Sequence, residues 1–389
     1  MKGEKKKINK RKEYDLVKLY SIILFCIFSV AVFLNYSFLG YLCAGFSKVE
    51  NKSMQVYFLN VGQASATMVV LPNRETLIYD TGSIESSDSF VDSIGMILRQ
   101  NKLSKINHLI LSHSDTDHVG GAVKLLKKFE VLNIYRPKIM STSANEIENT
   151  YGYKVVNNPI YNNVITAVYA EPNCDVKFVE NRTIVSSIFR LKVYAGKFDT
   201  YSQTNAYSPF VLMSFYDKNF LLTGDATAQR ETEFIEEFER ENIKIDFLQV
   251  AHHGAKSSTT AEFLLETNPT YAFVSAGDDT HPSQEVVSRL KDAGVSKIYC
   301  TKTDGMIGVG VNEDGVTAIC VMANSVDLPL FYVCISLVLF AVLQIRDKYH
   351  IKKRQNNYFK NKYYAGNLWF FSFILLLLRK LVCNISSLW

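Results

Sequence analysis

The sequence predicts an α/β domain built in layers, with uncharged apolar segments on either side of it. Three observations lead to this fold class. Of the 389 residues, 48% are hydrophobic and 21% are charged, which excludes a largely disordered chain. Short apolar runs of strand type and amphipathic runs of helix type alternate between residues 54 and 322. Long uncharged stretches lie outside that region, near the two ends of the chain.

The predicted strands are short runs in which apolar residues alternate with polar ones or follow one another without a break. They cover residues 54–61, 66–71, 75–80, 108–112, 209–216, 219–223, 246–251, 271–275, 297–301 and 316–322. Helical periodicity appears in residues 88–100, 120–129, 227–242, 259–267 and 283–293. Residues 138–208 are rich in Asn, Tyr, Ser and Thr and weakly patterned, so we expect an irregular insertion or flap there.

Cysteine usage and charge argue against three classes of protein. The seven cysteines form no CxxC pair, which argues against a disulfide scaffold and against a zinc module built from cysteine. The net charge of +5 comes from the ends, because residues 1–18 hold eight Lys or Arg and residues 346–362 hold seven. The region between them is mildly acidic, so we expect no stable nucleic-acid partner. The oligomeric state is left open.

Two apolar runs are long enough to cross a lipid bilayer, for which about 20 residues suffice. Residues 19–46 contain no charged residue and follow the basic tail 1–18. We expect an uncleaved transmembrane anchor there; the alternative is a cleaved signal peptide. Residues 328–345 form the second run. Because the basic segment 346–362 follows at once, we expect a transmembrane helix rather than a buried core helix.

The basic flanks set the orientation of these two segments. Lys and Arg accumulate on the cytoplasmic side of membranes, so both basic segments are expected in the cytoplasm. Residues 47–327 then form a domain on the extracytoplasmic side of the cell membrane. Residues 363–389 contain a third, shorter apolar segment, which is either another span or an interfacial segment.

The strongest chemical signal is a cluster of His and Asp directly after the predicted strand 108–112. His113, Asp115, Asp117 and His118 fall within six residues. Nitrogen and oxygen ligands that converge from such a loop are what Zn, Mn or Fe sites need. A polar loop that caps the next helix would explain Asp117 but not both histidines.

Other acids and histidines follow the ends of other predicted strands. Alone, each has a structural reading: Asp80 lies two residues before a glycine and Asp225 directly after one, as turn residues do, and His281 precedes a proline, as loop residues do. The pair His252 and His253 before a glycine favours a functional role. Because a layered α/β fold gathers the carboxyl ends of its strands on one edge, we expect all of these groups to meet there.

Together these motifs resemble the metallo-β-lactamase-fold hydrolases. More narrowly, they resemble the hydrolase domain of ComEC-type competence proteins and their free-standing membrane-anchored relatives. The resemblance covers about residues 54–322 and rests on FLNVGQ, LIYDTG, LSHSDTDHVGG, LLTGD, VAHHG and SAG…HP, in the order of the family. It implies a four-layer αββα sandwich, here with flanking transmembrane helices.

The resemblance also implies two divalent metal ions, Zn or Mn with Mg possible. His113 and Asp115 would bind the first ion. Asp117 and His118 would bind the second, together with His281. The family pattern is HxHxDH, in which Asp115 replaces the second His, as is usual in the ComEC-like branch.

The remaining site residues follow from the same resemblance. Asp225 would bridge the two ions, with Gly224 supporting it, and Asp80 would brace the loop from behind. Asn205 stands where many members of the superfamily place another metal-binding His. Asp117, His252 and His253 are the residues expected to act on the substrate, one of the two histidines by contacting the scissile group or donating a proton. One departure is that Ala64 and Ser65 replace the usual Gly-Asp pair.

The implied activity is that of a membrane-anchored metallo-hydrolase that uses a metal-bridged hydroxide. Phosphodiester substrates are favoured, whether nucleic acid, nucleotide or envelope polymer, because carboxylate ligands suit Mn or Mg as well as Zn. The alternatives are an acyl hydrolase on a lactone, thioester or lactam, and a catalytically silent metal-binding surface protein. DNA transport is not implied, because two or three spans cannot form the channel of full competence proteins.

Overall fold

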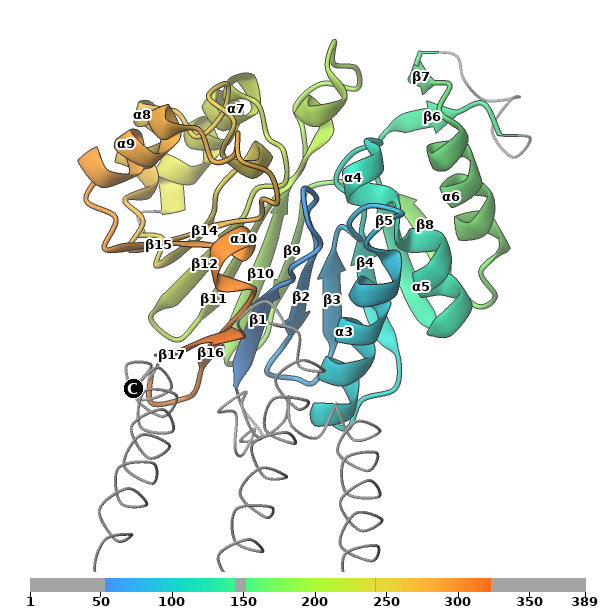
Figure 1. Cartoon of the computed structure of the whole chain (residues 1–389), viewed down its shortest axis with the longest axis horizontal. Coiled ribbons are helices and arrows are strands. Elements are labelled where there is room, and N and C mark those ends of the chain that lie inside the picture. The colour runs from blue at the N-terminus through green and yellow to red at the C-terminus, as the bar shows by residue number, and fades with distance from the viewer. Residues whose placement is uncertain (1–52, 144–151, 242, 316, 323–389) are drawn as a thin grey trace, which may run out of the picture. The chain divides into compact units, whose positions relative to one another are not determined.

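The computed structural model describes residues 53–143, 152–241, 243–315 and 317–322, all within one compact unit, Gly40–Asn324 (Figure 1). Among the helices of these residues, none is both long and apolar enough to cross a membrane. The five predicted terminal segments lie outside the described residues, so membrane attachment stays a prediction: 1–18, 19–46, 328–345, 346–362 and 363–389.

Two β-sheets form the centre of the described unit. The first sheet has eight strands, in the spatial order β17 (Thr317–Met322), β16 (Met306–Val311), β1 (Met54–Phe58), β2 (Thr67–Val70), β3 (Thr76–Tyr79), β4 (Ile106–Ile110), β5 (Val131–Arg136) and β8 (Asp175–Phe178). The second has seven, in the order β15 (Lys297–Cys300), β14 (Tyr271–Val274), β13 (Phe247–Gln249), β12 (Lys218–Leu222), β11 (Phe210–Phe215), β10 (Phe189–Tyr194) and β9 (Arg182–Val185). A separate two-stranded sheet pairs β6 (Ile139–Ser141) with β7 (Lys154–Val156).

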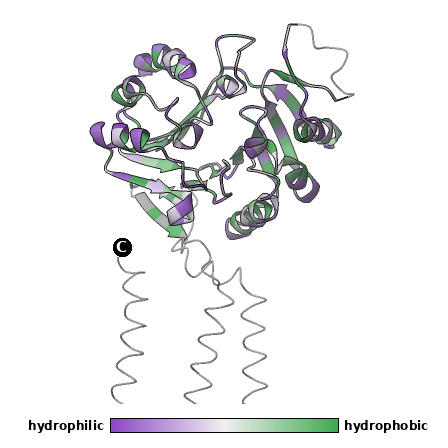
Figure 2. Ribbon diagram, turned by 45° about the horizontal axis from the view of Figure 1, so that its top comes forward, coloured by the Kyte–Doolittle hydropathy of each residue, from purple (hydrophilic) through white to green (hydrophobic). Residues whose placement is uncertain are grey.

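Helices cover the outer face of each large sheet. α3 (Ser87–Gln100), α5 (Ala122–Lys128) and α6 (Pro159–Ala170) pack on the first sheet through a buried cluster that includes Phe90, Leu125 and Tyr161. α7 (Ala228–Phe238), α8 (Ala261–Thr267) and α9 (Gln284–Asp292) pack on the second sheet through Phe234, Phe263 and Leu290. Hydrophobic residues concentrate on the strands and inner helix faces, while the outer faces are hydrophilic (Figure 2). The predicted layered α/β sandwich is confirmed.

Strand β1 shows how the sequence produces these layers. Successive side chains on a strand point to opposite faces of the sheet. Val56 and Phe58 accordingly join the cluster between the two sheets, while Tyr57 joins the cluster under the helices. Because both faces of the strand are covered, all five of its residues are buried and its sequence is a nearly continuous apolar run.

Parallel pairing brings several strand ends to one edge. β3, β4 and β5 are parallel neighbours in the first sheet, and β12 to β15 are parallel neighbours in the second. Asp80 and His113 lie just beyond the carboxyl ends of β3 and β4, and Asp225 and His252 lie just beyond those of β12 and β13. The edge on which the sequence predicted its polar groups to gather therefore exists.

The prediction for residues 138–208 was wrong. The described residues of that segment, 138–143 and 152–208, form α6, a short helical turn and five strands that include β8, β9 and β10. The β8 and β9 strands lie at sheet edges and keep many side chains exposed, so they lack the apolar runs by which strands are recognised. The start of α6 could have been predicted from Asn158 and Pro159, which are typical of helix N-termini. In the structure, the side chain of Asn158 accepts hydrogen bonds from the backbone N–H groups of Ile160 and Tyr161.

Two core strands were also missing from the sequence prediction. The β5 strand includes Asn133 and ends in the buried Arg136, which interrupts its apolar pattern. The β16 strand contains Gly308 and Gly310, and glycine is uncommon inside strands. Both strands are held by neighbours distant in sequence, which a local pattern does not reveal.

Candidate metal centre

The loop after β4 carries the first side chains of the site. His113 follows the strand and His118 lies in the short helix α4 (Thr116–Val119), and both are fully buried. Two glycines let this loop press against residues 81–84. A Cβ on Gly121 would lie 2.2 Å from the carbonyl oxygen of Thr81, and one on Gly120 would lie 2.5 Å from the backbone nitrogen of Ile84. No larger residue fits at either position, which explains the Gly-Gly pair.

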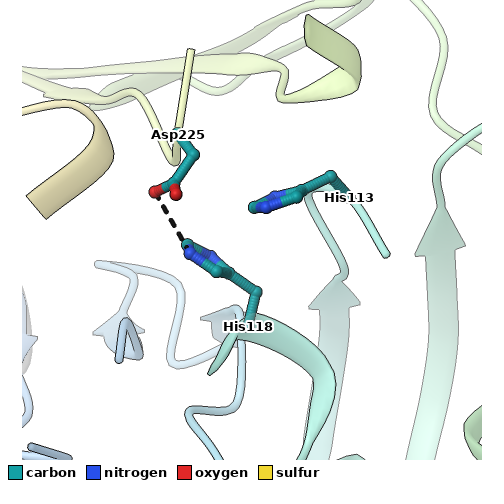
Figure 3. A group of neighbouring side chains, drawn as sticks. All are labelled: His113, His118 and Asp225. Atoms are coloured by element: carbon teal, nitrogen blue, oxygen red, sulfur yellow. Dashed lines mark ion pairs between the residues drawn. The ribbon is translucent and has the colours of Figure 1, made fainter. Parts of the chain in front are cut away.

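His113, His118 and Asp225 form the first group of potential metal ligands (Figure 3). One ligand atom of each lies within 4.8 Å of the others, and all three residues are buried. Nε2 of His118 is 3.1 Å from Oδ1 of Asp225. Two of these residues come from the first sheet and one from the second, so the group joins the two halves of the sandwich.

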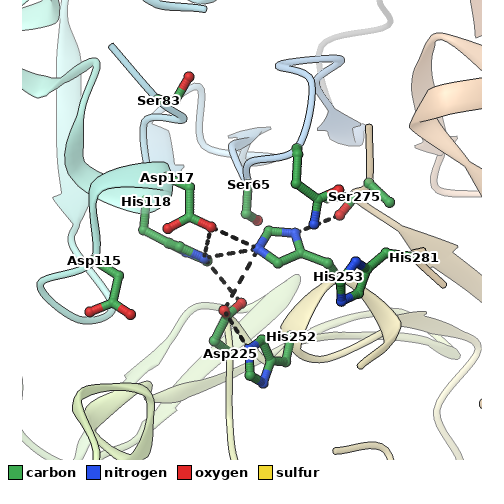
Figure 4. Close-up of polar contacts among 12 residues, drawn as sticks. Ser65, Ser83, Asp115, Asp117, His118, Asp225, His252, His253, Ser275 and His281 are labelled. Carbon is green, nitrogen blue, oxygen red and sulfur yellow. Dashed lines mark hydrogen bonds and ion pairs between the residues drawn. The ribbon is translucent and has the colours of Figure 1, made fainter. Parts of the chain in front are cut away.

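Asp117, His118 and His253 form a second group beside the first (Figure 4). Nε2 of His253 lies 3.2 Å from Oδ2 of Asp117 and 3.4 Å from Nε2 of His118. Asp225 adjoins this group as well, because its Oδ2 is 3.7 Å from Nε2 of His253. His118 belongs to both groups, so the two potential sites are neighbours.

Asp80 orients the histidines of the first group from behind. Its Oδ2 accepts a hydrogen bond from Nδ1 of His118 at 2.7 Å and one from the hydroxyl of Ser112 at 2.8 Å. That hydroxyl lies 2.8 Å from Nδ1 of His113. Because the Ser112 hydroxyl donates its proton to Asp80, the Ser112 oxygen accepts the Nδ1–H of His113. This assignment follows from the network and places the Nε2 atoms on the side of Asp225.

Three residues at this edge of the sheets have strained backbone conformations. Asp80 has a φ of 62°, and His252 and His253 have φ values of 53° and 54°, in the left-handed region that residues other than glycine rarely adopt. His253 is held there by a 2.7 Å hydrogen bond between its Nδ1 and the carbonyl oxygen of Ser275. Its Nε2 is thereby aimed at the second group.

His252 and Asn205 lie together beside Asp225. Nε2 of His252 is 3.2 Å from Nδ2 of Asn205 and 3.8 Å from Oδ2 of Asp225. The helical turn η2 (Thr204–Tyr207) carries Asn205, and the turn η4 (His252–Gly254) carries His252. The structure therefore places Asn205 near the site, where the sequence predicted it.

Gly224 allows the close approach of Asp225. Its φ is 53°, and a Cβ there would lie 2.7 Å from the hydroxyl of Tyr79 and 3.2 Å from Cβ of Ser208. Ser208 was not predicted from the sequence. Its hydroxyl accepts from the backbone N–H of Asp225 at 3.2 Å and lies 3.4 Å from Nδ1 of His113. A lone serine before a strand gives no signal that distinguishes it from a turn residue.

Charge is concentrated in these groups. Burial raises the pKa of the Asp225 carboxyl, but the positive charges of His118 and His253 outweigh it and hold the pKa well below its usual range. Burial likewise raises the pKa of Asp117, but a hydrogen bond from His253 and the charge of His118 lower it to about 2. Both carboxyls are ionised at neutral pH, as metal ligands must be.

The same charged groups shift the pKa values of the histidines. Burial lowers the pKa of His118, but Asp225 and Asp80 outweigh it and raise that pKa well above its usual value. Burial and the neighbouring His118 lower the pKa of His113, so its ring is neutral. The acidic groups therefore attract positive charge to this point, which is the charge that a divalent cation supplies.

A buried atom without a partner tests whether these residues fit a metal ion. Nε2 of His113 is buried and, among the described residues, no group hydrogen-bonds to it. An unpaired buried nitrogen is costly unless something binds it. A neutral imidazole beside an ionised carboxylate is a ligand set for a divalent ion. The residues present therefore fit metal ions. His113 and Asp225 could hold one ion, and Asp117 and His253 another, with Nε2 of His118, the ring nitrogen that Asp80 leaves free, binding one of the two.

Two predicted ligands lie outside these groups. Asp115 has Oδ2 3.7 Å from Nε2 of His113, but its side chain is 41% exposed. His281 turns its Nδ1 to Asp278, at 3.1 Å, and His253 lies beside Asp117 and His118 where the prediction had His281. The orientation of the two rings depends on Asp278 and on the carbonyl of Ser275, which the sequence does not show.

Comparison with known proteins agrees with this geometry. The model of the metallo-beta-lactamase superfamily matches residues 59–278, which is more than half of the chain. The chain belongs to the metallo-beta-lactamase superfamily. The predicted resemblance is thus confirmed, and with it a metal-dependent hydrolase domain that uses divalent ions. Every residue of the two ligand groups lies within the matched region.

Two curated proteins are similar to this chain in sequence. Recombination protein 2 of Haemophilus influenzae is 29% identical over 69% of this chain and 30% of its own length. ComE operon protein 3 of Bacillus subtilis is 27% identical over 65% of this chain and 32% of its own length. The chain thus spans about a third of the length of these curated relatives.

Among solved structures, the metallo-beta-lactamase fold protein YhfI of Bacillus subtilis is similar with a TM-score of 0.41 and 11% identity, over 69% of this chain and all of that one.

Proposed function

We propose that this chain is a membrane-anchored hydrolase of phosphodiesters that works with two divalent metal ions. The observation that carries the proposal is the pair of adjacent ligand groups that share His118, with Asp225 next to both. When bound, such a pair of ions supplies a hydroxide nucleophile at neutral pH and positive charge for the anionic oxygens of the substrate.

The ligand atoms favour a phosphodiester over an acyl substrate. Each group contains a carboxylate, and Asp115 offers a third carboxylate 3.7 Å from His113. Carboxylate ligands suit Mn and Mg as well as Zn, and these ions are the usual partners of phosphoryl oxygens. The names of relatives point the same way, since recombination acts on DNA, a phosphodiester polymer.

The chain's own groups hold this site in place. Asp80 fixes the ring of His118 and, through Ser112, that of His113. The carbonyl of Ser275 fixes His253. Because each ring is oriented before substrate arrives, little reorganisation remains to be made in the transition state.

The proposed location is the cell membrane, with the hydrolase domain on the extracytoplasmic side. Its support is the sequence alone: a basic segment before the uncharged run 19–46 and another after the run 328–345. The proposed substrate is accordingly a phosphodiester of the envelope or outside the cell, or a nucleotide or nucleic acid that reaches it.

The test uses the full-length chain in detergent. Its metal content is measured, and it is assayed on bis(4-nitrophenyl) phosphate and on a simple lactone. We expect phosphodiester turnover that falls by at least about 100-fold in Asp225→Asn, because that carboxylate lies beside both ligand groups. Asp217→Asn is the matched control, since Asp217 is 70% exposed in the turn between β11 and β12.

Three outcomes would reject the proposal. Turnover of the lactone alone would make the chain an acyl hydrolase. A chain without metal and without turnover would be a catalytically silent surface protein. Equal loss of activity in Asp217→Asn and Asp225→Asn would show that the loss does not come from the ligand groups.

A further inference from the structure

The metal centre takes its ligands from two separate sheets. Asp117 and His118 belong to loops of the first sheet, and Asp225 and His253 belong to loops of the second. In the described part of the chain, the space between the two sheets is filled by a buried apolar cluster. Apolar contact has no preferred direction, so it leaves the distance between the ligand loops loosely defined. A directional contact between these loops would define it.

The side chain of Gln249 makes such a contact, first with its own sheet. Gln249 is the last residue of β13 and is 1% exposed. Its Oε1 accepts from the backbone N–H of Thr223 at 3.1 Å and from that of Gly224 at 3.4 Å. Its backbone carbonyl accepts from the hydroxyl of Thr223 at 2.9 Å. The stretch of chain held in this way leads directly into Asp225.

The other end of the same amide reaches the first sheet. Its Nε2 donates to the hydroxyl of Ser65 at 3.2 Å and to that of Thr67 at 3.5 Å. Ser65 lies beside Asp117, whose carbonyl oxygen accepts from the backbone N–H of Ser65 at 3.1 Å (Figure 4). The carbonyl of Ser65 accepts from the backbone N–H of Gly82, in the loop after β3, at 2.9 Å. One side chain therefore links the loops that carry ligands on both sheets.

The orientation of the amide follows from its neighbours. A backbone N–H can only donate, so the amide atom that faces Thr223 and Gly224 is the oxygen. The NH2 group then faces the two hydroxyls, which can accept. An amide offers an acceptor and donors together, whereas a carboxylate has no donor and an alkyl chain has neither. Glutamine thus suits a position between two backbone N–H groups and two hydroxyls.

We propose that Gln249 is a positioning residue of the metal centre, which holds the chain before Asp225 at a fixed distance from the loop beside Asp117. The inference rests on the two-ion centre of the proposed function, though not on the identity of the substrate. Asp225 has Oδ1 3.1 Å from Nε2 of His118 and Oδ2 3.7 Å from Nε2 of His253. Because both distances depend on where the chain before Asp225 lies, a small shift would take the carboxylate away from one of the groups.

Burial makes the contact consequential. Both ends of it are buried, as are Thr223, Gly224 and Ser65. Without the amide, two N–H groups next to Asp225 lose this partner. An unpaired buried N–H is costly, so the chain would move until the two groups are paired again. Asp225 would move with it.

Gln249→Met in the full-length chain tests this role. Methionine keeps nearly the same volume and removes both ends of the contact. We expect the apparent Kd for Mn²⁺ to rise by about 10- to 100-fold in a competition titration with a chelator, the range for groups that orient metal ligands from behind. With excess Mn²⁺ filling both sites, electron paramagnetic resonance should show weaker magnetic coupling between the ions than in the wild type, because the loops are no longer held at one distance.

Gln55→Met is the matched control. Gln55 is also buried, but it lies near the start of β1, whereas the loop with Ser65 follows the end of that strand. Its Nε2 donates to Ser53 and its Oε1 accepts from Tyr57, so these contacts stay within one stretch of chain. Each substitution removes a buried amide and should lower the denaturant midpoint. Only Gln249→Met should change the affinity for Mn²⁺ and the magnetic coupling.

Ser65→Ala removes the first-sheet half of the contact and provides a milder variant should Gln249→Met not fold. We expect the apparent Kd for Mn²⁺ to rise by roughly 5-fold, the size of effect that one hydrogen bond carries. Because the two residues act through the same contact, the double variant should bind Mn²⁺ no more weakly than Gln249→Met alone.

Three results would overturn the inference: unchanged affinity for Mn²⁺ in Gln249→Met or in Ser65→Ala, an equal loss of affinity in Gln55→Met, or losses that multiply in the double variant. A wild-type chain that binds two ions but hydrolyses no phosphodiester would instead reject the proposed function and leave the role of Gln249 intact. A wild-type chain that binds no ion would reject both.

Discussion

Asp80 is the residue on which most of the site geometry depends. It contacts His118 directly and reaches His113 through Ser112, so one buried carboxylate sets the orientation of two rings. Its left-handed backbone conformation, with a φ of 62°, is uncommon for Asp and is kept in place by hydrogen bonds from the Ser112 side chain and backbone N–H.

Asp80→Asn should weaken metal binding. An amide group there presents an N–H to Nδ1 of His118 in one of its two orientations, which favours the tautomer whose proton sits on Nε2 and blocks that ligand atom. We expect affinity for Zn²⁺ or Mn²⁺ to fall by about 10- to 100-fold in a competition titration with a chelator. Asp217→Asn is again the control. Unchanged affinity in Asp80→Asn would contradict the role given to this carboxylate.

At the scale of single residues, the sequence predicted the participants better than their partners. His113, Asp117, His118 and Asp225 were found because they follow strand ends, and the structure brings them together. The sequence did not show that His253, and not His281, lies beside Asp117 and His118. The orientation of the two rings depends on contacts with Asp278 and the carbonyl of Ser275, and hydrogen bonds of this kind cannot be predicted from a sequence pattern.

At the scale of elements, short loops between strands and helices position the ligand side chains. The α4 helix can carry His118 toward Asp225 only because Gly120 and Gly121 let it lie against residues 81–84. Backbone hydrogen bonds add to this contact, since Thr81 donates to the carbonyl of His118 at 2.7 Å. The position of the helix is therefore coupled to the loop that contains Asp80.

Gly121→Ala should disturb this element and the metal centre with it. The added Cβ would lie 2.2 Å from the carbonyl oxygen of Thr81, a backbone atom that cannot move alone. We expect the free energy of unfolding to fall by about 2 kcal/mol, as for overpacking, together with weaker metal binding. Denaturant titration and metal analysis measure the two effects.

Gly95→Ala is the matched control for Gly121→Ala. Gly95 lies inside α3, and its nearest contact is the flexible end of Arg99 at 3.2 Å. Stability there should change by less than about 1 kcal/mol, with helix propensity favouring Ala. An equal loss of stability in both variants would show that the close approach of the α4 loop is not what Gly121 provides.

Burial on both faces made most strands predictable, whereas exposed edge strands and two core strands, β5 and β16, were missed. The β1 strand reads as a nearly continuous apolar run because sheet and helices cover it. The β8 and β9 strands lie at sheet edges, and their half-exposed sequences resemble loops. For β16, which contains Gly308 and Gly310, pairing with β1 and β17 overrides local preference.

At the scale of the whole molecule, the site is built across the sandwich. The first sheet supplies His113, Asp117 and His118, and the second supplies Asp225 and His253. Buried Gln249 of the second sheet also donates to the hydroxyl of Ser65, in the loop between β1 and β2, at 3.2 Å. A bound ion would thus tie both sheets together. The segments predicted to anchor this domain, 19–46 and 328–345, lie outside the described residues.

The number of metal ions bound per chain tests this account most directly. The full-length protein would be loaded with Mn²⁺ or Zn²⁺, freed of excess ion and analysed by mass spectrometry, beside His118→Ala. Asp80 holds one ring nitrogen of His118, and the nitrogen left free lies in both ligand groups, so we expect two ions in the wild type and fewer in the variant. A wild-type chain that binds no ion, or a variant that keeps both, would contradict it.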